Sequence, residues 1–184
     1  MKMKFVLLAM LLFIPTLAMA EEANAHRPFE IGWNVLTYNR QGSVNLYGGD
    51  LSFTANVKPK LGIVADVAIS QRTVNSIDVT ITQYRFGPKF MVKSGGRITA
   101  FTEFLAGGAR VTGSTSFTSG GTTTSASESA NGFSMAIGGG LDIGIKPWLA
   151  IRAPQVDYSY MHIDGGSSNG VRIGGGLLFR FGPH

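Results

Sequence analysis

Residues 133–145 read FSMAIGGGLDIGI, and their side chains alternate between two kinds. Apart from Gly139, the odd-numbered positions carry Phe, Met, Ile and Leu, whereas the even-numbered positions carry Ser, Ala, Gly and Asp. Successive side chains point to opposite faces of a β-strand, and a helix with its period of 3.6 would not sort them in this way. The stretch therefore predicts a strand with one large apolar face and one small polar face.

The same alternation recurs from residue 29 to residue 181. Residues 61–70 (LGIVADVAIS) and 171–181 (VRIGGGLLFRF) show it clearly. Five further segments show the alternation less regularly, namely 29–38, 45–57, 78–90, 97–111 and 148–162. The sequence thus predicts an all-β chain of eight strands.

Some details of these strands can also be predicted. In 29–38 we expect Leu36 to share the face of Glu30, and in 97–111 Glu103 assigns the odd-numbered face to the charges. Arg152 is even-numbered and Asp157 is odd-numbered, so the two can share a face only if the strand is irregular between them. A bulge is expected at Ala153-Pro154, because proline cannot join a regular ladder.

The composition limits the classes of protein that fit. The 184 residues are 44% apolar and only 15% charged, against about 25% charged in a typical soluble domain. There is no cysteine, which excludes disulfide scaffolds, thiolate zinc sites, cysteine nucleophiles and a lipidated N-terminal cysteine. No run of about 18 apolar residues is found after residue 20, so no transmembrane helix is expected.

Residues 1–20 have the features of a secretory signal peptide. Lys2 and Lys4 precede a short apolar stretch, and Ala18-Met19-Ala20 offers a cleavage site. Cleavage would leave 14 basic and 11 acidic residues in 21–184, a charge of +3 that is too small and diffuse to argue for nucleic acid. We expect a periplasmic stub at 21–28 and a barrel at 29–182.

The charged residues of the predicted strands fall mainly on the small polar face. Six acids and five bases nearly cancel there, and an eight-stranded barrel has an interior only just wide enough for side chains. We therefore expect a packed, charged interior and an apolar exterior that faces lipid, with Trp33, Tyr38, Tyr47, Trp148, Tyr158 and Tyr160 in aromatic girdles. The expected interior network is Glu30, Asp50, Asp66, Arg85, Lys89, Glu103, Asp142, Arg152, Asp157, Arg172 and Arg180.

The connections are expected to differ at the two ends of the barrel. Tight turns are predicted at 58–60, 94–96 and 146–147, and looser links at 40–43, 71–77 and 164–170. Residues 112–131, of which 15 are Ser, Thr or Gly, are expected to form a long polar loop that could meet an extracellular ligand. Short turns opposite long loops are typical of outer-membrane barrels.

The stretches 151–158 (IRAPQVDY) and 169–182 (NGVRIGGGLLFRFG) carry a family resemblance. The chain resembles the OmpA-like eight-stranded outer-membrane β-barrel proteins, also called porin-family or opacity-like proteins, over most of residues 21–184. The resemblance implies residence in the Gram-negative outer membrane among lipids and lipopolysaccharide, with periplasmic chaperones and the barrel-assembly machinery as partners. It also implies an assembly signal on the final strand, at Arg172, Gly174, Leu177, Phe179 and Phe181, although this chain continues to Gly182-Pro183-His184 instead of ending on the aromatic residue.

Few residues suggest chemistry of their own. His162, Asp164, Ser167 and Ser168 cluster before the last predicted strand and raise the alternative of a lipid A deacylase. A polar loop at a strand end is the simpler interpretation. The Gly138–Gly140 and Gly174–Gly176 triplets lie inside predicted strands and not before a helix, so they are not phosphate-binding loops. No cofactor and no metal site is expected.

We therefore predict an integral outer-membrane barrel that is not an enzyme and has a structural, surface-interaction or weakly pore-like role. A lipid A-modifying barrel enzyme is the first alternative. A soluble periplasmic carrier is the second, because alternation also occurs in barrels that hold a ligand. Inward-facing charges could line a pore, but the tight closure of eight strands favours a structural network.

Overall fold

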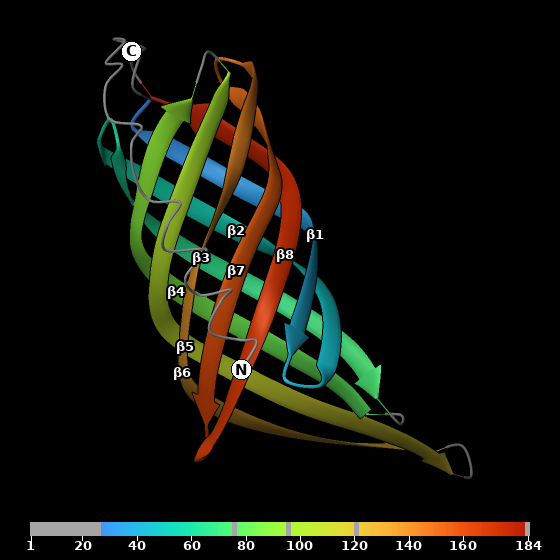
Figure 1. The fold of residues 1–184 in the computed structure, drawn as a ribbon. Helices are drawn as coiled ribbons and strands as arrows, with labels where there is room; N and C mark the ends of the chain where they lie inside the picture. Colours follow the sequence, from blue (N-terminus) through green and yellow to red (C-terminus); the bar gives the residue numbers. More distant parts are fainter. Residues whose placement is uncertain (1–26, 75–76, 95–96, 120–121, 183–184) are drawn as a thin grey trace.

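The computed structural model describes residues 27–74, 77–94, 97–119 and 122–182. Eight antiparallel strands follow one another around a closed barrel, and β1 pairs with β8 to complete it (Figure 1). The predicted signal peptide and most of the predicted stub lie outside the described residues. The strands are β1 (Phe29–Gln41), β2 (Val44–Lys58), β3 (Leu61–Val74), β4 (Ile77–Ser94), β5 (Ile98–Ser119), β6 (Thr122–Lys146), β7 (Leu149–Ile163) and β8 (Gly166–Phe181).

The burial pattern is the inverse of that of a soluble barrel. Along β3, Val64, Asp66, Ala68 and Ser70 are buried, whereas Ile63, Val67 and Ile69 are exposed. All eight strands expose large apolar side chains, so the wall of the barrel is apolar. The prediction of an eight-stranded, up-and-down transmembrane β-barrel is confirmed. Among the described residues there is no helix long and apolar enough to cross a membrane.

Bulges change the face of a strand at two places. In β7 the register shifts between Arg152 and Gln155, which confirms the bulge predicted at Ala153-Pro154. In β1 the register against β2 shifts between Asn34 and Thr37, and Leu36 is 79% exposed. The prediction that Leu36 shares the buried face of Glu30 is therefore wrong, because the extra residue of the bulge turns Leu36 outward and Thr37 inward.

The prediction that residues 112–131 form a long polar loop is also wrong. Most of these residues extend β5 and β6 as a hairpin whose pairing continues to Ser119 opposite Thr122. Alternation of apolar and polar residues cannot reveal a strand that has no apolar face, but backbone hydrogen bonds form there all the same, and threonine suits a strand. Beyond Thr115, β5 has no partner in β4, and before Gly132, β6 has no partner in β7. The hairpin thus projects as a two-stranded ribbon past the barrel (Figure 1).

The other links at that end are also shorter than predicted. Only Gly42 and Ser43 separate β1 from β2, and only Asp164 and Gly165 separate β7 from β8. Gly42, Asp164 and Gly165 have positive φ, as tight hairpin turns require. Of the predicted link 71–77, residues 75 and 76 lie outside the described residues.

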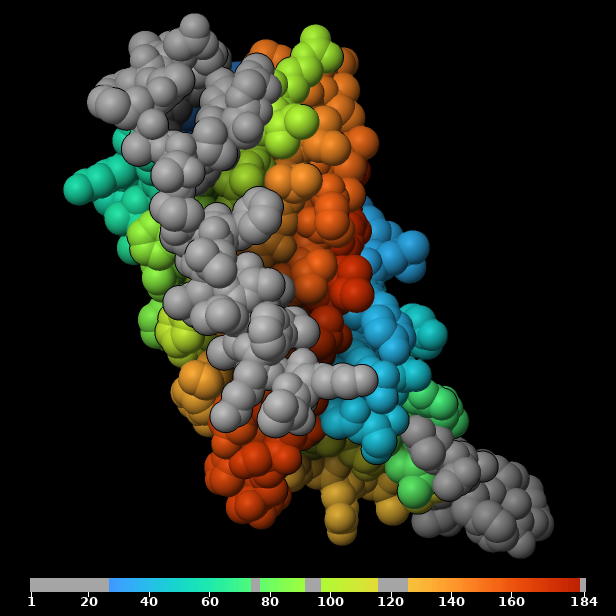
Figure 2. Space-filling model, viewed as in Figure 1, coloured from blue at the N-terminus to red at the C-terminus, as the bar shows by residue number. Residues whose placement is uncertain are grey.

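Phe29, the first residue of β1, pairs with Phe181, the last residue of β8. Both lie at the end of the barrel opposite the projecting ribbon, which we call the terminal end. The links at this end join β2 to β3, β4 to β5 and β6 to β7. In the space-filling view, side chains cover the described part of the visible wall, so the gaps between ribbons in Figure 1 are not openings (Figure 2).

Candidate functional site

The eleven charged residues of the expected interior network project from all eight strands. Ten are buried, and the side chain of Arg180 is 20% exposed near the end of β8. Room for the long cations comes from small neighbours. Gly32 on β1 is an example, because a Cβ atom there would lie 3.2 Å from Nη1 of Arg152. Their shared burial follows from the alternation, since each occupies the inward position of its strand.

One group of charges lies near the end with the chain termini. Lys89 Nζ is 3.0 Å from Glu30 Oε2 and 3.8 Å from Asp142 Oδ2. Arg152 donates two hydrogen bonds to Asp142, from Nε at 2.8 Å and from Nη2 at 3.1 Å. Arg180 Nε donates to the second oxygen of Glu30 at 3.1 Å. Each cation thus has a carboxylate partner, which buried charges require.

The ring of Phe101 supports this group. It lies 4.7 Å from Lys89 Nζ and 4.4 Å from the guanidinium carbon of Arg152, measured to the ring centroid. Both cations therefore face an aromatic ring as well as a carboxylate. Phe101 is buried on β5, whose odd-numbered face was assigned to the interior through Glu103.

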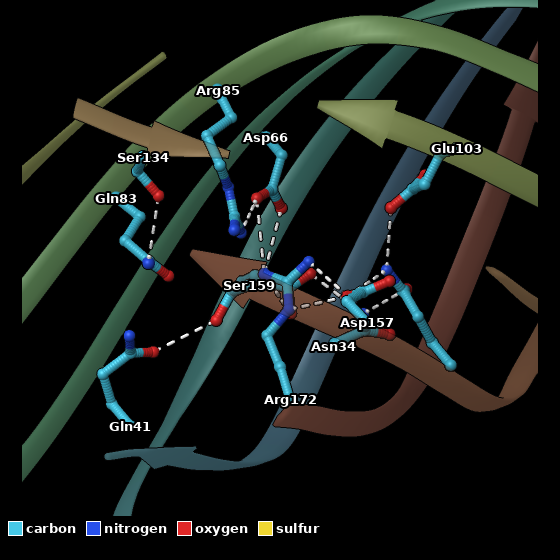
Figure 3. Close-up of polar contacts among 12 residues, drawn as sticks. Asn34, Gln41, Asp66, Gln83, Arg85, Glu103, Ser134, Asp157, Ser159 and Arg172 are labelled. Carbon is cyan, nitrogen blue, oxygen red and sulfur yellow. Dashed lines mark hydrogen bonds and ion pairs between the residues drawn. The ribbon is translucent and has the colours of Figure 1, made fainter. Parts of the chain in front are cut away.

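A second group is centred on Arg172 of β8 (Figure 3). Its Nη2 lies 2.7 Å from Asp157 Oδ2, and its Nη1 lies 3.3 Å from Asp66 Oδ1 and 3.5 Å from Asp50 Oδ2. Asp66 is also 2.7 Å from Arg85 Nη2. Arg172 therefore joins carboxylates from β2, β3 and β7 across the barrel.

Two side-chain amides join this group to the remaining acid. Asn34 Nδ2 donates to Asp50 Oδ1 and to Gln155 Oε1, both at 2.9 Å. Gln155 Nε2 in turn donates to Glu103 Oε1 at 3.0 Å and to Asp157 Oδ2 at 3.1 Å. Neither amide was among the predicted site residues. Both could have been found, because Asn34 shares the inward face of Glu30 and Gln155 follows the predicted β7 bulge with the parity of Asp157.

The interior also contains apolar side chains that were not predicted. Leu46, Ile81, Ala109 and Met161 are buried together toward the ribbon end, and Val44, Val79, Val111 and Ile163 pack against them. We call these eight residues the apolar layer. Leu46 has the parity of Asp50, and Ile81 has that of Arg85, so alternation carried past the charged positions would have placed both inside. The barrel is thus filled by ion pairs in part of its length and by apolar side chains in another.

Aromatic side chains gather on the outside near both ends. Tyr38 and Tyr47 pair across β1 and β2 beside the first hairpin, with ring centroids 5.7 Å apart. At the opposite end Trp148 stacks on Phe179 at 6.4 Å. The other candidates for the girdles are exposed or partly exposed: Trp33 lies within β1, and Tyr158 and Tyr160 lie on β7. Phenylalanines were not among the candidates, yet Phe29 stacks with Phe53 and Phe181 at the terminal end.

The cluster around His162 is an exposed cross-strand contact. Ser167 Oγ lies 2.9 Å from His162 Nδ1 and 2.9 Å from the hydroxyl of Tyr160. His162 and Ser167 are directly paired on β7 and β8. No carboxylate contact to His162 is found in the part of the chain that the structure describes, so the third member of a catalytic triad is missing there. Ser168 instead accepts a hydrogen bond at its backbone oxygen from Gln41.

Within the same described ranges, no group of three or more His, Cys, Asp or Glu side chains could hold a metal ion. No family model matches the sequence, and neither does any curated protein.

Solved structures, by contrast, match over most of the chain. Neisserial surface protein A is similar with a TM-score of 0.63 and 11% identity, over 84% of this chain and 97% of that one. The attachment invasion locus protein Ail of Yersinia pestis gives 0.54 and 19% identity, over 82% and 96%. The chain has the fold of an eight-stranded outer-membrane β-barrel. A second structure of Ail, bound to the heparin analogue sucrose octasulfate, matches with a TM-score of 0.50 and 20% identity, over 82% of this chain and 96% of that chain.

Proposed function

We propose that this barrel is an integral protein of the Gram-negative outer membrane, without enzymatic activity, whose role is structural and surface-interacting. The observation that carries the proposal is the inverted burial: ion pairs fill the interior, while Ile, Val, Leu and aromatic side chains cover the wall. In water such a wall would be an aggregation surface, and in a bilayer it is the surface that lipid requires. A soluble carrier would need the opposite arrangement.

The proposed orientation follows from the projecting ribbon. Outer-membrane barrels keep short turns in the periplasm and extend their longer hairpins outward. The end with Phe29 and Phe181 then faces the periplasm, and the β5–β6 ribbon projects outward among lipopolysaccharide. In this orientation the ribbon is the proposed place for contact with an extracellular ligand, because it is the longest described extension beyond the barrel.

The position of the final strand supports the proposed assembly signal. Arg172, Gly174, Leu177, Phe179 and Phe181 all lie on β8, which closes the barrel against β1. Phe181 pairs with Phe29 and Phe179 with Ile31. We propose that chaperones and the barrel-assembly machinery recognise this strand before it pairs with β1.

Fractionation tests the proposal. The protein should stay with membranes through osmotic shock and high salt, leave with detergent, and migrate differently on gels before and after boiling. Nitroxide labels at Ile137 and Val67, both exposed on the wall, should collide with oxygen in the bilayer and not with a water-soluble nickel complex. Release by osmotic shock, with both labels in water, would instead establish a soluble carrier.

A separate assay addresses the enzyme alternative. Purified protein incubated with lipid A should release no fatty acid, because His162 has a serine partner but lacks a carboxylate contact in the described chain. Release that disappears in the His162→Ala variant would show that the barrel is a deacylase.

A further inference from the structure

The two ends of the barrel carry different charges. At the terminal end, Lys58 ends β2, Lys60 lies in the β2–β3 turn, Arg97 precedes β5, and Lys146 ends β6. All four side chains are exposed. We call these four residues the basic rim.

No acid offsets the basic rim within the described ranges. Of the 11 acidic residues, Glu21 and Glu22 precede the described part. Six of the others are buried in the barrel, and Asp78, Glu128 and Asp164 are exposed at the ribbon end. At that ribbon end the three acids are matched in number by three exposed arginines, namely Arg40, Arg72 and Arg110. Exposed positive charge is therefore in excess at one end only.

The basic rim directly borders the apolar wall. Val57 is 60% exposed next to Lys58, and Ile98 is 42% exposed next to Arg97. Lys146 Nζ lies 5.5 Å from the centroid of the Trp148 ring, which is itself part of the aromatic girdle. The backbone oxygen of Arg97 accepts a hydrogen bond from Gly144 N at 2.7 Å, so Arg97 lies beside the end of β6, where Lys146 is the last residue. Long basic side chains in this position reach headgroup depth while their stems cover apolar surface.

We propose that the basic rim binds the phosphate headgroups of anionic phospholipids, in the leaflet that meets the terminal end of the barrel. The inference rests on the proposed function, since it requires the wall to be in a bilayer. Each lysine or arginine near an anionic membrane surface adds attraction, and the balanced opposite end has no such excess. The position of the cations beside the lipid-facing wall favours a headgroup over an acidic protein, because headgroups are the neighbours that the wall itself brings to the rim.

Trp148 provides a local probe of this binding. Trp33 is the only other tryptophan in the chain, so the Trp33→Phe variant leaves a single emitter beside Arg97 and Lys146. The variant is reconstituted into bilayers that contain phosphatidylcholine and phosphatidylglycerol in one fixed ratio. In one sample only the phosphatidylcholine carries bromine near its headgroup, and in the other only the phosphatidylglycerol does. The ratio of the two quenching efficiencies, each normalised to bromine-free bilayers, measures the lipid composition around Trp148.

Brominated phosphatidylglycerol should quench Trp148 about fivefold more per molecule in the bilayer than brominated phosphatidylcholine. Added Arg97→Gln and Lys146→Gln substitutions should bring the ratio close to one, as should high salt, which screens the headgroups. The matched control is Arg40→Gln with Arg110→Gln at the ribbon end, which should leave the ratio unchanged.

Three results would count against the proposal. Equal quenching by the two lipids overturns headgroup binding and leaves the membrane-spanning barrel intact. An equal loss of preference in the control variant shows that net charge, and not the basic rim, selects the lipid. The absence of quenching by either lipid shows that Trp148 is not in a bilayer, and in that case the proposed function fails first.

Discussion

Arg172 lies where three strands bring carboxylates together inside the barrel. Asp157, Asp66 and Asp50 are all within 3.5 Å of its guanidinium nitrogens, and all four residues are buried. The attraction among them has to offset the cost of removing the charges from water. Removing the cation would leave carboxylates without this compensation, which is more costly than removing a pair together.

Substitution Arg172→Met should therefore lower the free energy of unfolding by about 3–5 kcal/mol, as measured by denaturant titration in lipid vesicles with tryptophan emission. Arg180→Met is the matched control. Arg180 contacts one carboxylate, that of Glu30, and is partly exposed, so its loss should cost about 1 kcal/mol or less. Equal costs for the two variants would contradict a central role for Arg172.

On the lipid-facing wall of the barrel, in contrast to the interior, a charged side chain is expected to be destabilising. Ile137 is 57% exposed near the middle of the barrel portion of β6, where it pairs with Phe104 and Tyr158. Ile137→Arg should cost about 2–4 kcal/mol in vesicles, because the bilayer midplane cannot solvate a guanidinium. Ser127→Arg, on the ribbon beyond the barrel, should change the unfolding free energy little. A tolerated arginine at 137 would show that this position faces water.

At the scale of the strand, the β5–β6 ribbon and the barrel make separate contributions. Residues 116–119 and 122–125 pair only with one another, since the last β4 partner of β5 is Ile77 opposite Thr115. Replacing 116–125 with a two-residue Asn-Gly turn should therefore leave closure of the barrel intact. The shortened protein should keep its heat-dependent gel mobility and its unfolding midpoint. Failure to form the heat-modifiable species would mean that the ribbon is needed for assembly.

The strands also show what the sequence can and cannot predict. Alternation located all eight, because one face of each must meet lipid and the other the lumen, and Glu103 was enough to orient β5. Alternation missed the β1 bulge, because Leu36 fits the alternating sequence pattern. Only the pairing of β1 with its neighbours shows the extra residue. Alternation also missed the ribbon, where neither face meets lipid. The partners of Asn34 and Gln155 depend on which strands meet across the lumen, information that no single strand contains.

At the scale of the whole molecule, the contents of the lumen decide whether the barrel conducts. The two charged groups and the apolar layer lie at different heights along the same barrel, so an ion would have to displace paired arginines and also cross Leu46, Ile81 and Met161. An ion that loses its water in such a passage meets a steep barrier. The closed ring of eight strands leaves little spare width to bypass either obstacle.

Purified protein in planar bilayers should accordingly show no steady single-channel current at neutral pH. Ala substitutions at Leu46, Ile81 and Met161 together should not open it, because the ion pairs around Arg172 and Arg152 still cross the lumen. Steady current in the unmodified protein would contradict a closed interior, and the charged groups would then have to be the lining of a pore. In that case Arg152→Ala and Asp157→Ala should alter the conductance or ion selectivity, whereas Arg40→Ala on the outside should not.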